Sequence, residues 1–227
     1  MTGSNPARRG TPRLRADAAR NRAQILAAAR TAFRESGTAV PLDEIARRAG
    51  VNIATLYRRF PDRDALITQV LLDGFTLVLD TARTAAVAAQ TDPLTAVETF
   101  LQYLVEHRDL LALPLIGGAR TNDPQAHELQ REIAATLEEI LAEGRARKAL
   151  RPDVTAVDLI TTAALICRPL PHLPPRQATA LTARHLGVFL DGLRPERTRA
   201  LPPAPTHEEM AAHLALKDGP ADTPTEP

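Results

Sequence analysis

Cysteine and long hydrophobic runs are the first things this sequence lacks. The chain has one cysteine, Cys167, among 227 residues, so it cannot form an intrachain disulfide framework and suits a reducing compartment. No apolar run approaches the roughly twenty residues that a membrane-spanning helix needs. The basic N-terminus has no hydrophobic stretch of the kind found in signal peptides. These absences predict a cytoplasmic protein.

Patterns that carry catalysis or bind metals are missing as well. The six histidines are scattered without an HExxH pattern, and His207 and His213 stand six apart, which places them on different faces of a helix. Gly117 and Gly118 follow no strand-like segment, so they do not make a phosphate-binding loop. Cys167 has no cysteine partner, which favours a buried, inert thiol over a redox sensor. We therefore expect no enzyme activity, no metal ion and no cofactor.

Strand-like alternation is also absent, and alanine and leucine dominate the apolar residues, which make up 44% of the chain. This composition predicts an all-α fold, and a length of 227 residues suits one small and one medium domain. Proline and glycine breaks predict helices at about 16–36, two short helices within 40–62, and helices at about 63–89, 93–107, 124–148, from 151–153 to 167, and 175–193, with a short helix also compatible with 207–216.

The most informative segment is 40–62, which reads VPLDEIARRAGVNIATLYRRFPD. Its first part carries apolar residues at the spacing i, i+3, i+4 and i+7, the buried face of a short helix: Leu42, Ile45, Ala46 and Ala49. Gly50 can take the positive φ that ends this helix, and Asn52 can cap the next one. The segment therefore predicts a helix-turn-helix, whose second helix typically enters the major groove of DNA.

The charge is divided unevenly along the chain. Residues 1–63 hold thirteen arginines and five acids, a charge of +8, and since the whole chain carries +1 the remainder carries −7. A basic first quarter on an acidic body favours a nucleic-acid-binding domain over arginines that merely solvate helix faces. The earliest arginines form a basic arm that either follows DNA phosphates into the minor groove or is only a disordered start: Arg8, Arg9, Arg13 and Arg15.

The stretch 25–66 resembles the DNA-binding domain of tetracycline-repressor-like (TetR-type) transcription regulators. The resemblance is carried by Ile25-Leu26-x-Ala-Ala-x-x-x-Phe33, the Gly37 stop, Ile45-Ala46-x-x-Ala49-Gly50-Val51, and Thr55-Leu56-Tyr57-x-x-Phe60-x-Asp-Arg63-x-x-Leu66. The motifs cover under a quarter of the chain but are dense and in order. They imply a homodimeric, ligand-responsive regulator, more often a repressor than an activator.

The resemblance also assigns DNA-contacting roles. Tyr57 matches a position that contacts a phosphate or a base edge, Thr55 and Arg59 match phosphate-binding positions, and Arg63 matches a phosphate clamp at the start of the long helix. The exposed side of the short helix, where base edges are read, carries Ile53, Ala54 and Arg58, and Asn52 precedes it. From the residues alone, Ile53 suits the core edge equally well, Arg58 and Arg59 could simply be solvated, and Leu56 and Phe60 are core.

Two positions depart from the family pattern. Val40 and Pro41 stand where a capping serine or threonine that touches phosphate is common, so that hydroxyl is missing. Asp43 stands where some relatives place a basic residue that reads a base. The operator sequence is therefore not transferable from any relative.

The body is predicted to bind an apolar small molecule between its helices. The candidate lining residues, each of which could instead be ordinary core, are Phe75, Leu79, Phe100, Tyr103, Leu104, His107, Leu115, Ile116, His127 and Ile166. The proline- and glycine-broken stretch 113–124 is the expected flexible wall of the pocket.

The last two long helices carry stripes that predict a four-helix dimer interface with two-fold symmetry, although such stripes can also close a monomer's own core. One stripe is Ala178, Leu181, His185, Phe189 and Leu193, and the other is Ile160, Ala163, Ala164 and Cys167.

Together these features predict a flexible basic arm (1–15), a helix-turn-helix DNA-binding domain (16–64), a helical effector-binding and dimerisation domain (65–195) and a proline-rich, disordered tail (196–227). The partners expected are an operator in double-stranded DNA, a second copy of the chain and a small effector. The alternative from another class is a helical small-molecule-binding protein or enzyme whose helix-turn-helix is vestigial. An activator or architectural DNA binder is a third possibility.

Overall fold

The computed structural model describes residues 11–111, 123–168, 170, 172–196, 199–206 and 209. Within these residues every regular element is a helix, which confirms the all-α prediction. The helices are α1 (Thr11–Ser36), α2 (Leu42–Arg48), α3 (Ile53–Arg59), α4 (Arg63–Ala89), α5 (Pro93–Glu106), α7 (Pro124–Ala146), α8 (Ala156–Ile166) and α9 (Pro175–Gly192).

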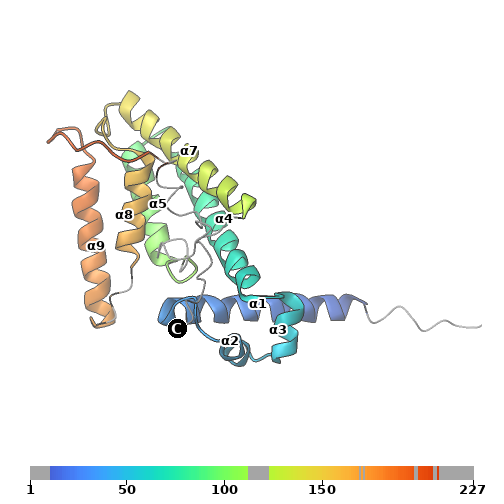
Figure 1. Ribbon diagram of the computed structural model, residues 1–227. Helices are drawn as coiled ribbons and strands as arrows, with labels where there is room; N and C mark the ends of the chain where they lie inside the picture. Colours follow the sequence, from blue (N-terminus) through green and yellow to red (C-terminus); the bar gives the residue numbers. More distant parts are fainter. Residues whose placement is uncertain are drawn as a thin grey trace, which may run out of the picture.

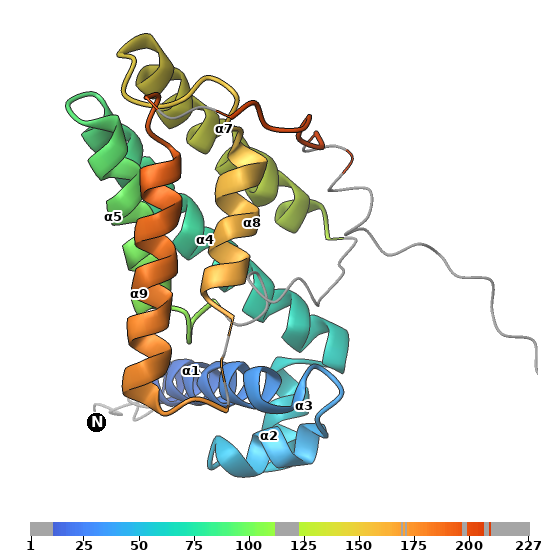
Figure 2. The same cartoon turned by 90° about the vertical axis from the view of Figure 1, so that its left-hand side faces the viewer.

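The helices form two units joined by α4. In Figure 1, α1 lies across the lower end of the molecule with α2 and α3 beneath it, and α4 rises from this unit into the body. In the body α4 packs along α7 and α5, while α8 contacts α7 and α5 and α9 contacts α5 and α8, so that α8 and α9 form the front of the body in Figure 2. By length and composition α4 alone among the described helices could cross a membrane, but one face of it is buried in the core, where it packs against α5 and α7.

The helix-turn-helix forms as the sequence predicts, with its helices ended and capped by nearby residues. Gly50 has a φ of 66°, and its amide and that of Val51 donate to carbonyls of the last turn of α2. The side chain of Asn52 accepts a hydrogen bond from the amide of Ala54 at 2.8 Å and so caps α3. Gly37 ends α1 with a φ of 75°. Helices α1, α2 and α3 and the start of α4 close on a common core of fully buried side chains: Ile25, Phe33, Ile45, Leu56 and Leu66.

Three helix ends differ from the sequence predictions. The first helix begins at Thr11, five residues earlier than expected, so residues 11–15 of the predicted arm are helical and residues 1–10 lie outside the described residues. Helix α7 stops at Ala146 because Lys148 adopts a left-handed φ of 55° and the amides of residues 149 and 150 turn back to the carbonyl of Gly144. Helix α8 begins only at Ala156, after a capping box between Thr155 and Asp158.

An ion pair lies just before the start of α8. The Arg151 guanidinium is buried and bonds both carboxylate oxygens of Asp153, at 2.6 and 2.8 Å. These bonds hold the pKa of Asp153 at about 2, below its ordinary value of 3.8. Arg151 also donates to the carbonyl of Arg199, and Asp153 accepts from the amide of Leu201. The first described part of the predicted tail is therefore held against the body.

Farther along the tail, Thr206 and Glu209 exchange the hydrogen bonds of a helix cap, since the hydroxyl of Thr206 accepts from the amide of Glu209 and the carboxylate of Glu209 accepts from the amide of Thr206. The rest of the helix compatible with 207–216 lies outside the described residues.

Candidate functional site

Helix α3 presents a polar face to solvent and buries a single side chain. Leu56 is the buried residue, and it anchors the helix on the three-helix core. On the opposite side Ala54 and Arg58 are exposed one turn apart, and Tyr57 is 50% exposed although its ring is large and apolar. An exposed tyrosine beside exposed arginines on a short helix suits a surface that meets a charged polymer.

The other predicted DNA-contacting residues occupy two different environments. Asn52 and Arg59 are exposed, whereas Ile53 and Thr55 are half-buried and Ile53 packs against the hydrophobic core. Arg63 is half-buried too, and its Nη1 donates to the carbonyl of Thr38 at 2.7 Å and to that of Val40. Arg63 therefore fastens the loop between α1 and α2 to the start of α4.

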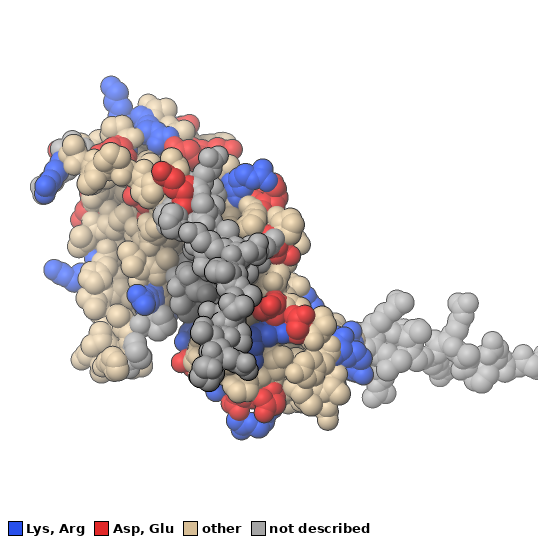
Figure 3. All heavy atoms as spheres, in the orientation of Figure 1, with Lys and Arg blue, Asp and Glu red and all other residues tan. Residues whose placement is uncertain are grey.

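The arginines of the first domain differ in how far they are neutralised. On α2, Arg47 and Arg48 both bond Glu44, whose pKa they lower through these hydrogen bonds, and Arg48 also bonds Glu35. Figure 3 accordingly shows acidic and basic side chains side by side at the lower end of the molecule, where Figure 1 places α2. Among the described residues, Arg58 and Arg59 have no ion-pair partner. Helix α3 therefore presents two exposed arginines that are free for a phosphate backbone, whereas those of α2 are paired, a difference that the count of arginines in the sequence did not reveal.

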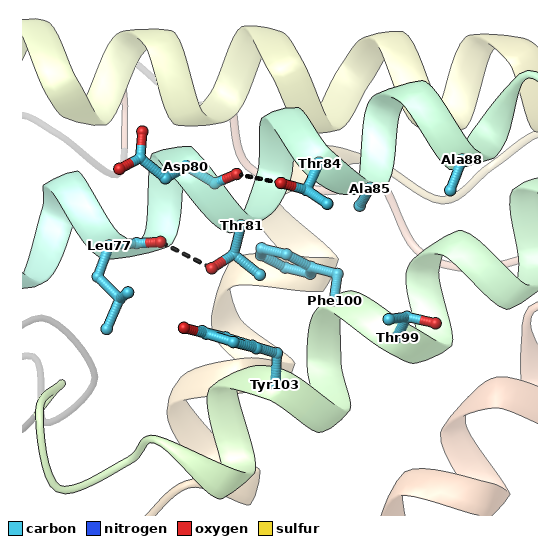
Figure 4. Close-up of a pocket in the computed structure, with 9 residues that line it drawn as sticks. All are labelled: Leu77, Asp80, Thr81, Thr84, Ala85, Ala88, Thr99, Phe100 and Tyr103. Carbon is cyan, nitrogen blue, oxygen red and sulfur yellow. Dashed lines mark hydrogen bonds between the residues drawn. The ribbon is translucent and has the colours of Figure 1, made fainter.

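A cavity of about 230 Å³ lies between α4 and α5. Two of the predicted pocket residues, Phe100 and Tyr103, line it from α5, and in Figure 4 Tyr103 points toward Leu77 of α4. The remaining lining residues, which the sequence reasoning missed, come mostly from one face of α4: Leu77, Asp80, Thr81, Thr84, Ala85, Ala88 and Thr99. The sequence pattern that could have predicted them is weak, since alanine and threonine are also common on helix faces that bind no ligand.

Hydrogen bonds within α4 and α5 use up the donors of the threonine hydroxyls that line the cavity. The hydroxyls of Thr81, Thr84 and Thr99 each donate to the carbonyl four residues earlier, at 2.7–2.9 Å. Their oxygens therefore keep only lone pairs for a bound molecule. Lysine, arginine and histidine are absent from the residues that line the cavity.

The other predicted pocket residues lie elsewhere. Phe75, Leu79 and Leu104 are buried in the core, and Ile166 is half-buried against it at the end of α8. His127 is exposed in the first turn of α7. His107 caps α5 and stacks on the Tyr103 ring, with ring centroids 3.9 Å apart, so it supports the cavity from behind its wall. Leu115, Ile116 and all but the end of the predicted wall lie outside the described residues.

The two stripes predicted as a dimer interface divide between the core and the surface. Ala163, Cys167 and Leu193 are buried within the protomer, and burial raises the pKa of the Cys167 thiol to about 11. Leu181 and Phe189 are half-buried, as are Ile160, Ala164 and Ala178, while His185 is exposed.

Two large apolar side chains outside these stripes, Leu165 of α8 and Val188 of α9, are 69% and 64% exposed. Helices α8 and α9 therefore both expose large apolar side chains beside the predicted stripes.

Comparison with known proteins identifies both units. Residues 25–70 match the family model described as bacterial regulatory proteins, tetR family, and residues 92–195 match the SbtR-like C-terminal domain of transcriptional regulators. A search of curated protein sequences found no match.

Solved structures extend these matches over most of the chain. The TetR regulatory protein from Mycobacterium vanbaalenii is 34% identical, with a TM-score of 0.52, over 80% of this chain and 99% of that one. A TetR transcriptional regulator from Streptomyces coelicolor is 29% identical, with a TM-score of 0.52, over 78% and 99%. The ketosteroid transcriptional regulator KstR2 of Mycobacterium tuberculosis, at 18% identity and a TM-score of 0.59 over 77% and 95%, shares the fold. With a helix-turn-helix, a helical body and this degree of identity over four fifths of its length, the chain belongs to the tetR family of bacterial regulatory proteins.

Proposed function

We propose that this protein is a homodimeric repressor that acts in the cytoplasm, binds a pseudo-palindromic operator through α3, and is released from it by a small, uncharged effector. The observation that carries the proposal is the exposed face of α3, where Arg58 and Arg59 have no ion-pair partner among the described residues while the arginines of α2 are paired. A cation without an internal partner loses no ion pair when it binds a phosphate.

The roles on α3 follow from position. Arg58 and Ala54 share the exposed face, so they are suited to base edges, with a guanine for the arginine and a thymine methyl for the alanine. Arg59 and Tyr57 are suited to phosphates on either side. Arg63 already donates to two carbonyls of the α1–α2 loop. We propose that it keeps these bonds and donates its remaining N–H groups to a phosphate. Asn52, Ile53 and Thr55 would then contribute through the start of the helix.

A second copy of the chain is needed to read two half-sites. We propose that it docks on α8 and α9, because Leu165 and Val188 expose apolar surface there and the half-buried Leu181 and Phe189 continue the patch. His185 stands one turn from Leu181 and from Val188 on the same face of α9, and Ala164 is next to Leu165 on α8. A two-fold axis through this face would pair the two α3 helices on one side of the duplex.

The proposed effector enters the cavity between α4 and α5. Aromatic and aliphatic walls favour an apolar ring compound, and threonine oxygens with only lone pairs free favour one that carries uncharged donors such as hydroxyl or amide N–H groups. An anionic ligand such as a phosphorylated metabolite would find no cation among the residues that line the cavity. Helix α4 connects the two functions, because its first residue, Arg63, holds the α1–α2 loop and its later turns line the cavity.

The test begins with purified protein and a random duplex library, from which the wild type is expected to select an inverted repeat. Affinity for the selected duplex is then measured for the double variant Tyr57→Ala/Arg59→Ala and for Arg131→Ala, a matched control on the exposed surface of α7. The double variant is expected to lose most of its affinity and the control to keep it. If no duplex is selected at low salt, or if both variants bind equally well, the proposal fails and a helical binding protein or enzyme with a vestigial helix-turn-helix becomes the better description.

A further inference from the structure

Helix α1 is tied to the body by two ion pairs on one of its faces. Arg30 and Arg34 stand one turn apart on α1. The Nη2 of Arg30 lies 3.0 Å from the carboxylate of Asp73 on α4, and Arg34 bonds the carboxylate of Asp109 in the turn after α5. The first domain is thus held by acids from two different elements of the body.

The anchor on α4 is the more enclosed of the two. The side chains of Arg30 and Asp73 are 20% and 30% exposed, and the second oxygen of Asp73 accepts from the side-chain Nε2 of Gln69 at 2.7 Å. The Nε of Arg30 is buried without a hydrogen-bond partner, so Arg30 depends on Asp73 for its pairing. This pair therefore fixes α1 to α4 in one orientation.

The anchor after α5 is mounted on a rigid turn. The amide of His107 donates to the carbonyl of Tyr103, the amide of Leu110 donates to the carbonyl of His107, and Leu111 is fully buried. The His107 ring stacks on Tyr103 at an interplanar angle of 16°. Asp109 therefore cannot move far unless the end of α5 moves with it.

The helices that carry these anchors are also the walls of the cavity. Leu77 and Thr81 follow Asp73 by one and two turns on α4, and they line the cavity with Tyr103 of α5 (Figure 4). The ring of Tyr103 stacks on His107, two residues before Asp109. A molecule that pushes α4 and α5 apart must change the separation between Asp73 and Asp109. The backbone positions of Arg30 and Arg34 keep their spacing, because both stand on one continuous helix, so a change in the Asp73–Asp109 separation must be taken up by the side chains of the ion pairs or by breaking one of them.

We propose that a change in the distance between α4 and α5 is transmitted to α1 through these two ion pairs. The Arg34–Asp109 pair then couples the occupancy of the cavity to the DNA-binding domain, independently of the covalent connection through α4. The inference rests on the proposed effector-controlled DNA binding. Arg34 and Asp109 are positioning residues, since neither lies on the exposed face of α3 nor lines the cavity. The more exposed pair is the one expected to break, since Asp109 is 71% exposed.

The experiment uses substitutions that fill the cavity in place of an unidentified effector. Thr81→Phe puts a ring against Tyr103, and Ala88→Phe fills the cavity from the next turns of α4 should the first variant fold poorly. Affinity for the selected duplex is measured with and without each filling substitution, in the wild type and in Asp109→Asn. The filling substitution is expected to weaken DNA binding at least about fivefold in the wild type, the lower end of typical allosteric coupling, and by less than about twofold in Asp109→Asn.

Two further variants separate coupling from general damage. Glu132→Gln breaks the ion pair between α7 and Arg83 of α4, which is also exposed and between helices but does not involve α1, so the filling substitution should keep its full effect there. Reversing the charges with Arg34→Glu and Asp109→Arg should restore the coupling that Asp109→Asn loses.

The outcomes are distinguishable. If the wild type selects no duplex, the proposed function fails. If it does, and the filling substitution weakens binding equally with and without Asp109, the ion-pair route is refuted while the proposed function stands. A filled cavity that leaves DNA affinity unchanged, with the ring verified against Tyr103 by its NMR shifts, also refutes the route.

Discussion

Replacing Arg59 with glutamine is expected to remove one phosphate contact from each protomer while leaving α3 intact. The side chain is exposed at the end of the helix, and among the described residues it has neither an ion-pair nor a hydrogen-bond partner that the substitution would leave unsatisfied. Helix propensity changes little, since arginine and glutamine are both good helix formers. The expected loss is therefore one of DNA affinity and not of folding.

The magnitude follows from counterion release. Each phosphate contact contributes about 0.9 to the slope of log affinity against log salt, so a dimer that loses two contacts should show a slope smaller by about 1.8. Between 0.05 and 0.2 M salt, a fourfold change, the wild type should then lose about twelvefold more affinity than the variant does. Arg58→Gln should behave differently, costing about 1–3 kcal/mol at one base position in each half-site of the operator and little elsewhere.

Fluorescence anisotropy over this salt range, with the selected duplex and an unrelated one, measures both effects. Arg131→Gln is the matched control, because Arg131 is an exposed arginine on α7 that pairs only within its own helix. Equal salt slopes for the wild type and Arg59→Gln would refute the assignment of Arg59 to a phosphate. If Arg59→Gln changes the base preference but not the salt slope, Arg59 contacts a base and the roles assigned to Arg58 and Arg59 must be exchanged.

Three further predictions concern assembly and stability. Val188→Arg places a charge on the exposed apolar face of α9, so sedimentation velocity should show monomers. If the variant is still a dimer, the interface lies elsewhere. Gly144→Ala should lower Tm, because its Cβ would overlap the buried Leu150 side chain at a typical overpacking cost of about 1–3 kcal/mol, against about 1 kcal/mol gained in helix propensity; a higher Tm would contradict the close packing. The folded-state pKa of Asp153 is depressed to about 2 by Arg151, so the stability from their pair is present above pH 4 and lost as pH falls toward 2. Thermal denaturation of Asp153→Asn should therefore show a shallower decline than the wild type in that window, and identical declines would exclude this pair as the cause.

The sequence by itself determined the elements and the family. Helices end or begin at Gly37, Gly50 and Asn52 through bonds to residues within four or five positions. These helix ends can therefore be predicted from the neighbouring sequence. The all-α prediction and the TetR-type resemblance rest on such local signals, and both are confirmed. The starts of α1 and α8 were less accurate, since helix ends depend on weak competition between caps.

The assignments that remain predictions are those that depend on partners far along the chain. The sequence shows that Arg30, Arg34, Arg58 and Arg59 are arginines, but only the folded chain brings Asp73 and Asp109 to the first two and leaves the last two without acids among the described residues. The DNA contacts of α3 and the α8–α9 dimer face stay predictions for the experiments above.

Tertiary structure alone decided which faces of the body helices are core, cavity or surface. Leu79 and Leu77 are both leucines on α4, yet one is buried and the other lines the cavity, and Leu193 is buried while Val188 is exposed on α9. Helical periodicity fixes which residues share a face, because the backbone repeats every 3.6 residues. It does not fix which neighbour covers that face, since this depends on how α4, α5, α7, α8 and α9 cross one another in the folded molecule.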